Sequence, residues 1–300
     1  MNFYQLEVFC TVAKVSSFTR AARLLHLTQP AVSAQVKGLE AALGVQLFNR
    51  HGRGVSLTHA GELVYDYARK ILALASTMER EIAETISDTG GHLRIAATEI
   101  VGRYILPCTV WTFRRSHPST KIHIQIASKE LVLRLLDEGA ADVAVLEGEV
   151  PAEGRQVQSM GREQVVLITP PSRKWRDKKE VDLEELLEEN IVVSLQDTTM
   201  RSLWGEALKA AGVDEGRVSI VEVGGEEGLK SAVMAGLGVA LVLKITALKE
   251  IHEGTLHSVK VRRLPASLPL HAVYRPDAAP GITRRFVSMV CNTPIDCANG

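Results

Sequence analysis

The sequence lacks any segment that would carry it into or across a membrane. None of its apolar runs is long enough to span a bilayer. The N-terminus, MNFYQLEVF, has no basic stretch followed by an apolar core, so we find no signal peptide and expect a cytoplasmic protein without membrane contact. With 300 residues and a hydrophobic content of 46%, the chain resembles an ordinary globular protein of two or three domains.

Cysteine is scarce and scattered, which argues against a disulfide framework and against the usual zinc-ligand spacing. The four cysteines, with no CxxC pair among them, are Cys10, Cys108, Cys291 and Cys297. We assign Cys10 to a helical apolar face and expect no bound metal. A redox role for Cys108 or for the C-terminal pair is the alternative that the sequence leaves open.

Enzyme motifs are missing as well. The chain contains no G-x-G-x-x-G, P-loop or G-x-S-x-G sequence, and we therefore expect no catalytic residues and no cofactor. The glycines at 236–238 lack the third glycine of a dinucleotide fingerprint, and we interpret them as a helix stop before a buried strand. An enzyme on a Rossmann-like scaffold is the alternative.

The net charge is zero, but its distribution is uneven. Residues 1–58 carry six lysines and arginines against two glutamates, a net charge of +4 that the rest of the chain balances. A local basic excess favours contact with phosphates, so the zero total does not exclude nucleic acid.

Residues 17–47 have the pattern of two short helices joined by a tight turn, typical of a helix-turn-helix. Ser17 can cap the first helix and Thr28 the second, and Gly44 can end it. The apolar residues of the second helix recur at helical spacing: Val32, Val36 and Leu39. The polar residues between them could reach base edges or phosphates: Gln29, Ser33, Gln35 and Lys37. A surface helix pair of an enzyme has the same local pattern.

The flanking segments decide between these interpretations. Residues 3–15 predict a helix that packs under the other two, and residues 47–58 predict a two-stranded wing with Arg50 and Arg53 near its tip. An arginine on a wing can enter the minor groove or bind a phosphate, although two solvated arginines on a loop would look the same.

A long helix should follow, from Thr58 to about Ile86, because glycine and proline are absent from 62 to 87. Its apolar residues alternate steps of four and three: Ala60, Val64, Tyr67, Ile71, Leu74 and Met78. Such a heptad seam predicts a homodimer that holds two DNA readers about one helical turn of DNA apart. Packing onto the same chain is the alternative. Residues 87–92 have the composition of a hinge.

Strands alternate with helices from His92 onward, which predicts parallel sheets with right-handed crossovers, in one doubly wound domain or in two lobes. The expected strands are 92–97, 121–127, 142–147, 162–168, 190–195, 217–223, 238–243 and 268–274. The expected helices are 100–115, 129–138, 183–189, 200–211, 226–236 and 281–291.

Ligands of doubly wound sheets bind at the carboxyl ends of strands, near helix N-termini. The hydroxyl-bearing residues at such junctions are Thr98, Ser128, Ser194, Thr198 and Thr199. Hydroxyls at helix N-termini suit a carboxylate or another anion. Any one of these residues could instead only cap its helix.

Three stretches make the sequence resemble the LysR-type transcriptional regulators along nearly its whole length. They are FYQLEVF to THAGE (3–62), GRYILPCTVWTFRRSHPSTKIHI (102–124) and VMAGLGVALV (233–242). The resemblance implies a multidomain α plus α/β protein: a winged helix-turn-helix (1–58), a dimerisation helix and hinge (59–90), and a two-lobed effector domain (91–300) like periplasmic binding proteins. The lobes would be 91–161 with 267–300, and 162–266.

The resemblance also implies specific site residues and partners. Those for DNA are Thr28, Gln29, Pro30, Ser33, Lys37, Arg50 and Arg53, whereas Ala34 stands where many members carry arginine. For the effector, it favours Thr98 and Ser128. The implied partners are double-stranded promoter DNA, a small effector and further copies of the chain, usually in a homotetramer, with RNA polymerase as a further candidate. A two-lobed solute-binding protein is the remaining alternative.

Overall fold

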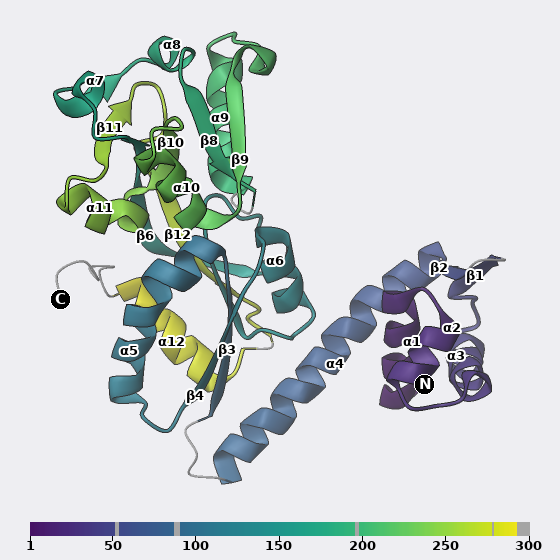
Figure 1. The fold of residues 1–300 in the computed structure, drawn as a ribbon. Helices are drawn as coiled ribbons and strands as arrows, with labels where there is room; N and C mark the ends of the chain where they lie inside the picture. Colours follow the sequence, from purple (N-terminus) through teal and green to yellow (C-terminus); the bar gives the residue numbers. More distant parts are fainter. Residues whose placement is uncertain (52–53, 87–90, 196–197, 278, 293–300) are drawn as a thin grey trace. The chain divides into compact units, whose positions relative to one another are not determined.

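The structure is a computed structural model that describes the backbone of residues 1–51, 54–86, 91–195, 198–277 and 279–292 (Figure 1). The side chains of residues 50, 51, 80, 81, 83–86, 198 and 215 also lie outside the description. The chain divides into two compact units, residues 1–87 and most of the chain from residue 88 onward. None of the described helices combines the length and apolar composition needed to cross a membrane.

The N-terminal unit is a three-helix core with a two-stranded wing and a long helix, as the sequence predicts. Its elements are α1 (Phe3–Val15), α2 (Phe18–Leu24), α3 (Gln29–Leu43), β1 (Phe48–His51), β2 (Gly54–Leu57) and α4 (His59–Ile86). Ser17 and Thr28 accept hydrogen bonds from Arg20 N and Ala31 N, so both predicted caps are confirmed. Gly44 ends α3 with a left-handed φ of 71°.

The core of this unit forms because each helix places its apolar residues on one face. Phe9, Val32 and Leu39 are fully buried in it. The Phe9 ring contacts that of Phe48, with centroids 5.3 Å apart, so the first wing strand is packed onto the helices.

The C-terminal unit has two lobes that share two strands. The first lobe has the strand order β4-β3-β5-β12-β6. It contains β3 (His92–Ala97), a π-helix (Val101–Ile105), α5 (Leu106–Ser116), β4 (Lys121–Ile126), α6 (Lys129–Asp137), β5 (Val143–Glu147) and α12 (Gly281–Asn292). Phe113 of α5 meets Phe286 of α12 edge to face in its core.

The second lobe contains the strands β10, β11 and β7 around the far end of β6, and a parallel pair, β8 and β9. Its strands are β7 (Glu180–Val181), β8 (Asn190–Ser194), β9 (Ser219–Val223), β10 (Ala240–Leu243) and β11 (His257–Val261). Its helices are α7 (Arg173–Arg176), α8 (Leu183–Leu186), α9 (Thr198–Ala210), η2 (Glu215–Arg217), α10 (Gly225–Met234), η3 (Lys244–Ala247) and α11 (Leu248–His252).

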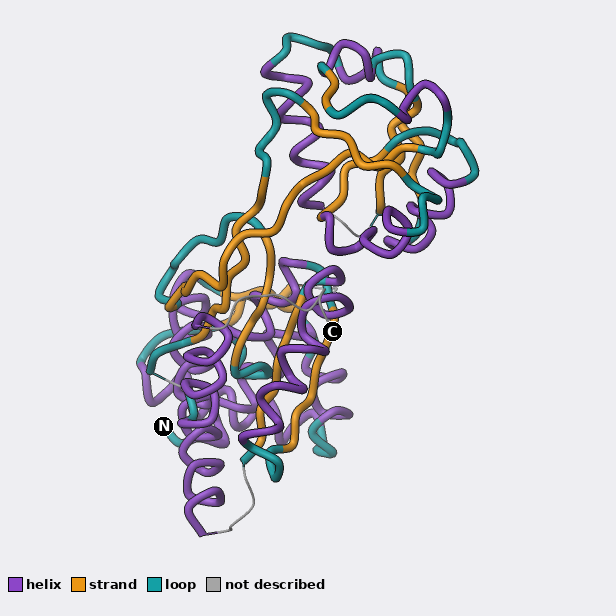
Figure 2. The backbone as a smooth tube through the Cα atoms, turned by 90° about the vertical axis from the view of Figure 1, so that its left-hand side faces the viewer, coloured by secondary structure: helices purple, strands orange, loops and turns teal. Residues whose placement is uncertain are grey.

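Two antiparallel strands, β6 (Gln156–Thr169) and β12 (Ser267–Tyr274), run between the lobes (Figure 2). On β12, Leu268 lies in the core of the second lobe and Leu270 in that of the first. The register shifts at Leu270, opposite Gly161, whose φ is 116°. The lobe boundaries predicted at 161/162 and 266/267 lie within and beside these strands.

The expectation of parallel sheets is only partly right. Strands β3, β4 and β5 are parallel, as are β8 and β9. Strands β10, β11 and β12 instead pair antiparallel with β6, because the chain crosses between the lobes on β6 and returns on β12. The sequence-based prediction also missed β7 and β11, and it placed the start of β6 six residues late.

Candidate functional site

The second helix of the helix-turn-helix presents a polar outer face. Its apolar residues point into the core, and this leaves Gln29 and Lys37 exposed and Ser33 half-buried on the opposite side. These three residues are spaced by four, so they follow one another along one face of α3. The exposed Ala34 adds only a methyl group to this surface.

The N-terminus of α3 is exposed together with this face. Thr28 is exposed, and its hydroxyl accepts from Ala31 N at 3.4 Å, so its side chain is used at least partly as a cap. Pro30 lies in the first turn, where the missing N–H leaves no hydrogen bond unmade. A helix N-terminus of this kind is a favourable position for a phosphate.

The wing is tied to the helices at both ends. Glu40, buried at the end of α3, accepts a hydrogen bond from Leu47 N at 2.8 Å. Val55 N donates to Ser16 O at 3.4 Å. Arg50 pairs in register with Val55 on β1, but its side chain and all of Arg53 lie outside the described residues.

Two of the predicted hydroxyl residues of the C-terminal unit meet at a glutamate that the sequence-based prediction missed. Glu147 ends β5 and is 3% exposed. Thr98, which follows β3 in the first lobe, donates to Glu147 Oε2 at 2.5 Å. Thr199, on α9 of the second lobe, donates to Glu147 Oε1 at 3.5 Å. The carboxylate therefore joins the two lobes.

A lysine adds positive charge beside this carboxylate. Lys129 Nζ donates to the backbone oxygens of Glu147 (3.3 Å) and Glu149 (2.8 Å). Gly148 lies between Lys129 and Thr199, since a Cβ there would be 3.4 Å from both Lys129 Nζ and Thr199 Cγ2. These contacts define a cleft cluster consisting of Thr98, Lys129, Glu147 and Thr199.

The remaining predicted effector residues have different positions. Ser128 is exposed, and its hydroxyl accepts from Leu131 N at 3.4 Å as a cap of α6. Ser194 is buried at the end of β8, and the side chain of Thr198 lies outside the described residues. The structure thus brings Thr98 and Thr199 together, whereas the described contact of Ser128 is with its own helix.

A second network connects the lobes through Tyr104 of the π-helix. Its hydroxyl donates to Glu227 Oε1 at 2.7 Å. Burial and this hydrogen bond raise the pKa of Tyr104. Glu227 also pairs with the buried Lys230, which donates to Glu250 Oε1 at 2.7 Å and to Thr246 O at 3.0 Å. No sequence motif indicated the contact between the lobes, because Tyr104 and Glu227 lie 123 residues apart in the chain.

Two of the described cysteines are held as thiols by burial. Burial raises the pKa of Cys10 to about 12, and it also raises the pKa of Cys291. Cys108 is a half-buried free thiol, and Cys297 lies outside the described residues. Among the residues that the structure describes, no three His, Cys, Asp or Glu side chains form a group that could hold a metal ion.

Comparison with known proteins identifies both units. Residues 3–62 match the family described as bacterial regulatory helix-turn-helix protein, lysR family, and residues 87–292 match the LysR substrate binding domain. A probable RuBisCO transcriptional regulator of Porphyra purpurea is 31% identical over 91% of this chain and 87% of its own. One from Synechocystis sp. is 31% identical over 91% of this chain and 80% of its own.

Solved structures show the same fold over nearly the full length. A full-length OxyR variant from Pseudomonas aeruginosa aligns with a TM-score of 0.71 and 22% identity, covering 98% of this chain and 96% of its own. CbnR complexed with its target DNA aligns with a TM-score of 0.62 and 24% identity, covering 97% and 99%. The chain therefore belongs to the LysR family of DNA-binding transcriptional regulators, which are not enzymes.

Proposed function

We propose that the protein binds promoter DNA with the outer face of α3, in the cytoplasm, and changes its binding in response to a small molecule. The observation that carries the first part is the division of α3 into a packed apolar face and an exposed polar face. Gln29 and Ser33 would contact base edges, and Lys37 would contact phosphate, since amides and hydroxyls read bases and a flexible ammonium neutralises the backbone. Arg50 and Arg53 would add wing contacts.

A gel-shift series on a promoter and on altered half-sites tests this assignment. Gln29→Ala should change the order of preference among half-sites, whereas Lys37→Ala and Arg53→Ala should weaken binding to all of them alike and lower its salt dependence. Gln46→Ala, which removes an exposed amide outside α3, is the matched control. Equal losses for Gln29→Ala and Lys37→Ala across all half-sites would contradict the division.

We further propose a homodimer through α4, and two such dimers in a tetramer. Tyr67, Leu74 and Met78 are 50–60% exposed on the heptad seam. The first seam residues, Ala60 and Val64, pack against the helix-turn-helix core instead. The seam therefore needs a partner mainly from Tyr67 onward, and a second copy of α4 supplies the same pattern.

The cleft cluster is the proposed effector site. Glu147 already accepts from the hydroxyls of Thr98 and Thr199, so an anionic group would be received by Lys129 and by the N-terminus of α6 at Ser128. A carboxylate effector that also carries a hydroxyl or an amine matches both charges of the cluster, because that donor can bind Glu147. Such a ligand would shift the population of lobe arrangements and thereby the DNA contacts.

A thermal-shift series separates these chemistries, since a ligand that binds the native state raises the melting temperature. Propionate presents a carboxylate alone, and isopropylamine presents an amine alone. Lactate combines a carboxylate with a hydroxyl, and alanine combines a carboxylate with an amine. We expect the second or third type to stabilise most, and Glu147→Gln to abolish its advantage over propionate. If only neutral or cationic compounds stabilise the protein, the anionic effector is wrong.

A further inference from the structure

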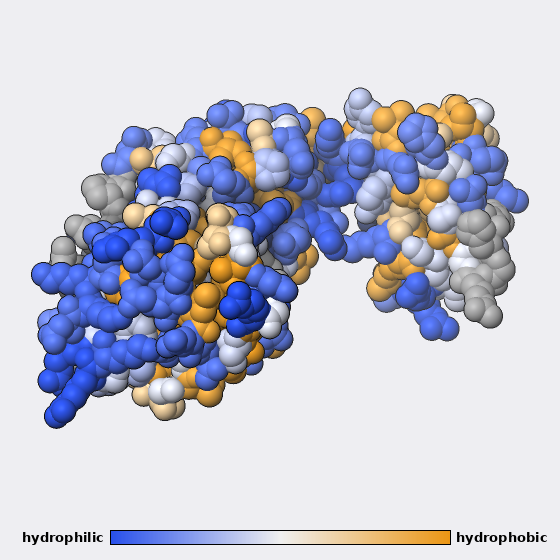
Figure 3. All heavy atoms as spheres, turned by 90° about the horizontal axis from the view of Figure 1, so that it is seen from above, coloured by the Kyte–Doolittle hydropathy of each residue, from blue (hydrophilic) through white to orange (hydrophobic). Residues whose placement is uncertain are grey.

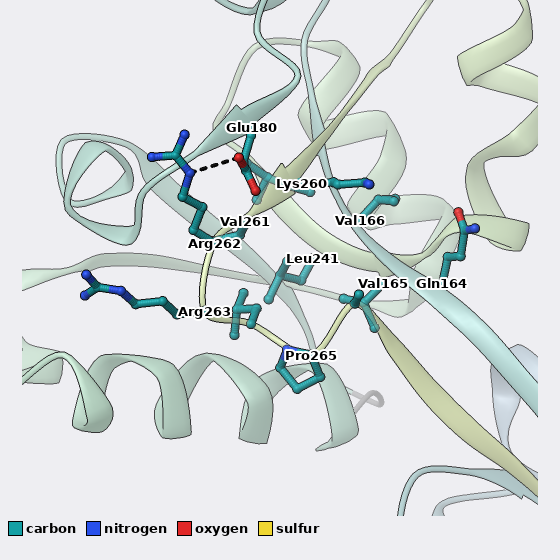
Figure 4. Close-up of a pocket in the computed structure, with 13 residues that line it drawn as sticks. Gln164, Val165, Val166, Glu180, Leu241, Lys260, Val261, Arg262, Arg263 and Pro265 are labelled. Atoms are coloured by element: carbon teal, nitrogen blue, oxygen red, sulfur yellow. Dashed lines mark hydrogen bonds and ion pairs between the residues drawn. The ribbon is translucent and has the colours of Figure 1, made fainter.

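The second lobe contains a cavity, and no residue of the cleft cluster lies in its lining. Its volume is about 420 Å³, within the range of small-molecule sites. Figure 4 shows its lining residues, which come from β6, β7, β10, β11 and the turn that follows β11. They are Gln164, Val165, Val166, Leu167, Glu180, Leu241 and 260–266.

The backbone builds this cavity by exchanging strand partners. Strand β11 pairs with β6 from His257 to Val259, and then Lys260 and Val261 pair with β7 instead. The segment rejoins β6 only where Val165 N donates to Ala266 O at 3.0 Å. Residues 260–265 thus bulge away from β6, and both sides of the opening are held by hydrogen bonds.

The cavity combines an apolar floor with a positively charged rim. Val165 and Leu241 are 7% and 2% exposed and belong to the core of the lobe. Three cationic side chains stand at the rim, against one carboxylate, Glu180. Arg262 is directed at that carboxylate (Figure 4), with Nε 2.9 Å from Oε2, and it also pairs with Asp182, with Nη1 3.0 Å from Oδ2, so the charge of Arg262 is fully compensated.

The other two cations have no such partner. Lys260 and Arg263 are exposed, and neither forms an ion pair with any residue that the structure describes. In Figure 4 they extend to opposite sides of the segment that carries them. Arg263 also has a φ of 67°, a left-handed conformation that costs free energy for a residue with a Cβ. Residues 260–263 therefore carry two positive charges without an ion pair to a described residue, beside an apolar cavity.

We infer that this cavity is a second ligand site, for a small organic anion with an apolar body, separate from the proposed effector site around Glu147. Lys260 binds the anionic group, Arg263 adds positive charge on the other side of the same segment, and the apolar body lies on Val165 and Leu241. Carboxylates and phosphate esters share this chemistry, because an ammonium group donates charge-assisted hydrogen bonds to the oxygens of both.

Isothermal calorimetry on the full-length chain tests the site with four probes: phenyl phosphate, phenylacetate, inorganic phosphate and phenethylamine. We expect phenyl phosphate or phenylacetate to bind best, inorganic phosphate more weakly and phenethylamine not at all. Preference for phenyl phosphate assigns a phosphate ester, and preference for phenylacetate a carboxylate. Failure of both organic anions to bind, or equally tight binding of inorganic phosphate or phenethylamine, would overturn the inference.

Variants show whether the binding is in this cavity. The double substitution Lys260→Gln and Arg263→Gln should raise the Kd of the better probe about tenfold. Lys209→Gln with Lys249→Gln removes two exposed lysines of the same lobe that do not line the cavity, and it should leave the Kd unchanged. If the two double variants raise the Kd equally, the probe is attracted by exposed positive charges anywhere on the lobe and does not bind in this cavity.

Two further variants keep this site distinct from the effector cleft. Thr98→Val alters the cleft cluster and should not change the Kd of the probe. Ala266→Phe places a ring at the edge of the cavity and should prevent its binding. If Thr98→Val abolishes binding of the probe and Ala266→Phe does not, the probe binds at the proposed effector site and the second site is wrong. If Thr98→Val abolishes only the response of DNA binding to a metabolite, the result bears on the proposed effector function and not on the second site.

Discussion

At the level of single residues, the joint between wing and long helix depends on the absence of one side chain. A Cβ at Gly61 would lie 2.1 Å from Leu47 O, which is backbone and cannot move aside. Thr58 holds the same joint, because its hydroxyl donates to Gln46 O at 2.8 Å and accepts from Gly61 N at 2.9 Å. The start of α4 is therefore fixed against the first wing strand.

We predict that Gly61→Ala destabilises the N-terminal unit by at least about 2 kcal/mol, as overpacking does, and lowers DNA affinity. Thermal unfolding followed by circular dichroism measures the first effect. Gly38→Ala is the matched control, since its Cβ would meet only atoms of the Gln5 side chain, the nearest being the amide nitrogen at 2.8 Å. A similar melting temperature for the two variants would show that the joint tolerates a side chain.

Residues whose partners are close in sequence could be predicted, and residues whose partners are distant could not. Thr28 and Gly44 act within one helical turn, and the sequence identified both. Glu147 accepts hydrogen bonds from Thr98, 49 residues away in the chain, and from Thr199, 52 residues away. The signal was a charged residue ending the otherwise apolar strand 143–147, and it has meaning only once the strands are placed.

At the level of elements, helix α4 has one part that packs on the helix-turn-helix core and another part whose apolar residues are exposed. Its first turns bury Ala68 against the helix-turn-helix core, while later seam residues remain exposed. Apolar side chains also reach the surface of the N-terminal unit elsewhere (orange on the right-hand body in Figure 3). What distinguishes the seam is its regular spacing from Ala60 to Met78 on one continuous helix of 28 residues.

Leu74→Glu should weaken self-association through α4, because it places a charge in the middle of the seam. We expect sedimentation analysis to show at least a halved mass, with tenfold or weaker binding to a promoter because two half-sites are no longer bound together. Ser76→Glu adds the same charge to the exposed side of α4 away from the seam, and the mass should be retained. An unchanged mass of Leu74→Glu would place the dimer contact elsewhere.

Elements with a strong period were predicted nearly to the residue, such as β3 at 92–97. Strand β11 was missed because its partners change along its length, and its sequence, HSVKV, is short and partly charged. The predicted parallel direction of β10 and β12 relative to β6 was wrong for a different reason. Alternating strands and helices favour parallel pairing, and nothing local indicates that β6 crosses to a second lobe.

At the level of the whole effector domain, the Tyr104 network makes the contact between lobes dependent on pH. Hydrogen bonds from Tyr104 and Lys230 lower the pKa of Glu227 below its usual 4.5. This stabilisation is complete above pH 4.5 and is lost as the pH falls through the folded pKa. Burial lowers the pKa of Lys230, but hydrogen bonds to Glu250 and Glu227 raise it overall above 10.5, so its contribution is lost in strong alkali.

Glu227→Gln should therefore be less stable than the parent at pH 7 and equally stable at about pH 3. The difference should be at most about 1 kcal/mol, since the Glu227 side chain is 62% exposed. Melting temperatures measured from pH 3 to pH 7 check this. Glu253→Gln, which removes an exposed carboxylate with no ion pair to a described residue, should not differ from the parent at either pH. A gap that persists at pH 3 would assign the loss to packing.

The two strands shared by the lobes also limit the mechanics of the domain. Two neighbouring antiparallel strands, β6 and β12, connect the lobes, and they pair with each other from Gln156 to Gln164 on β6. Their irregularities, Gly161 and the shift at Leu270, lie opposite each other. A change in the angle between the lobes should therefore bend β6 and β12 at this point, and it would move Thr199 of the second lobe toward or away from Glu147 of the first.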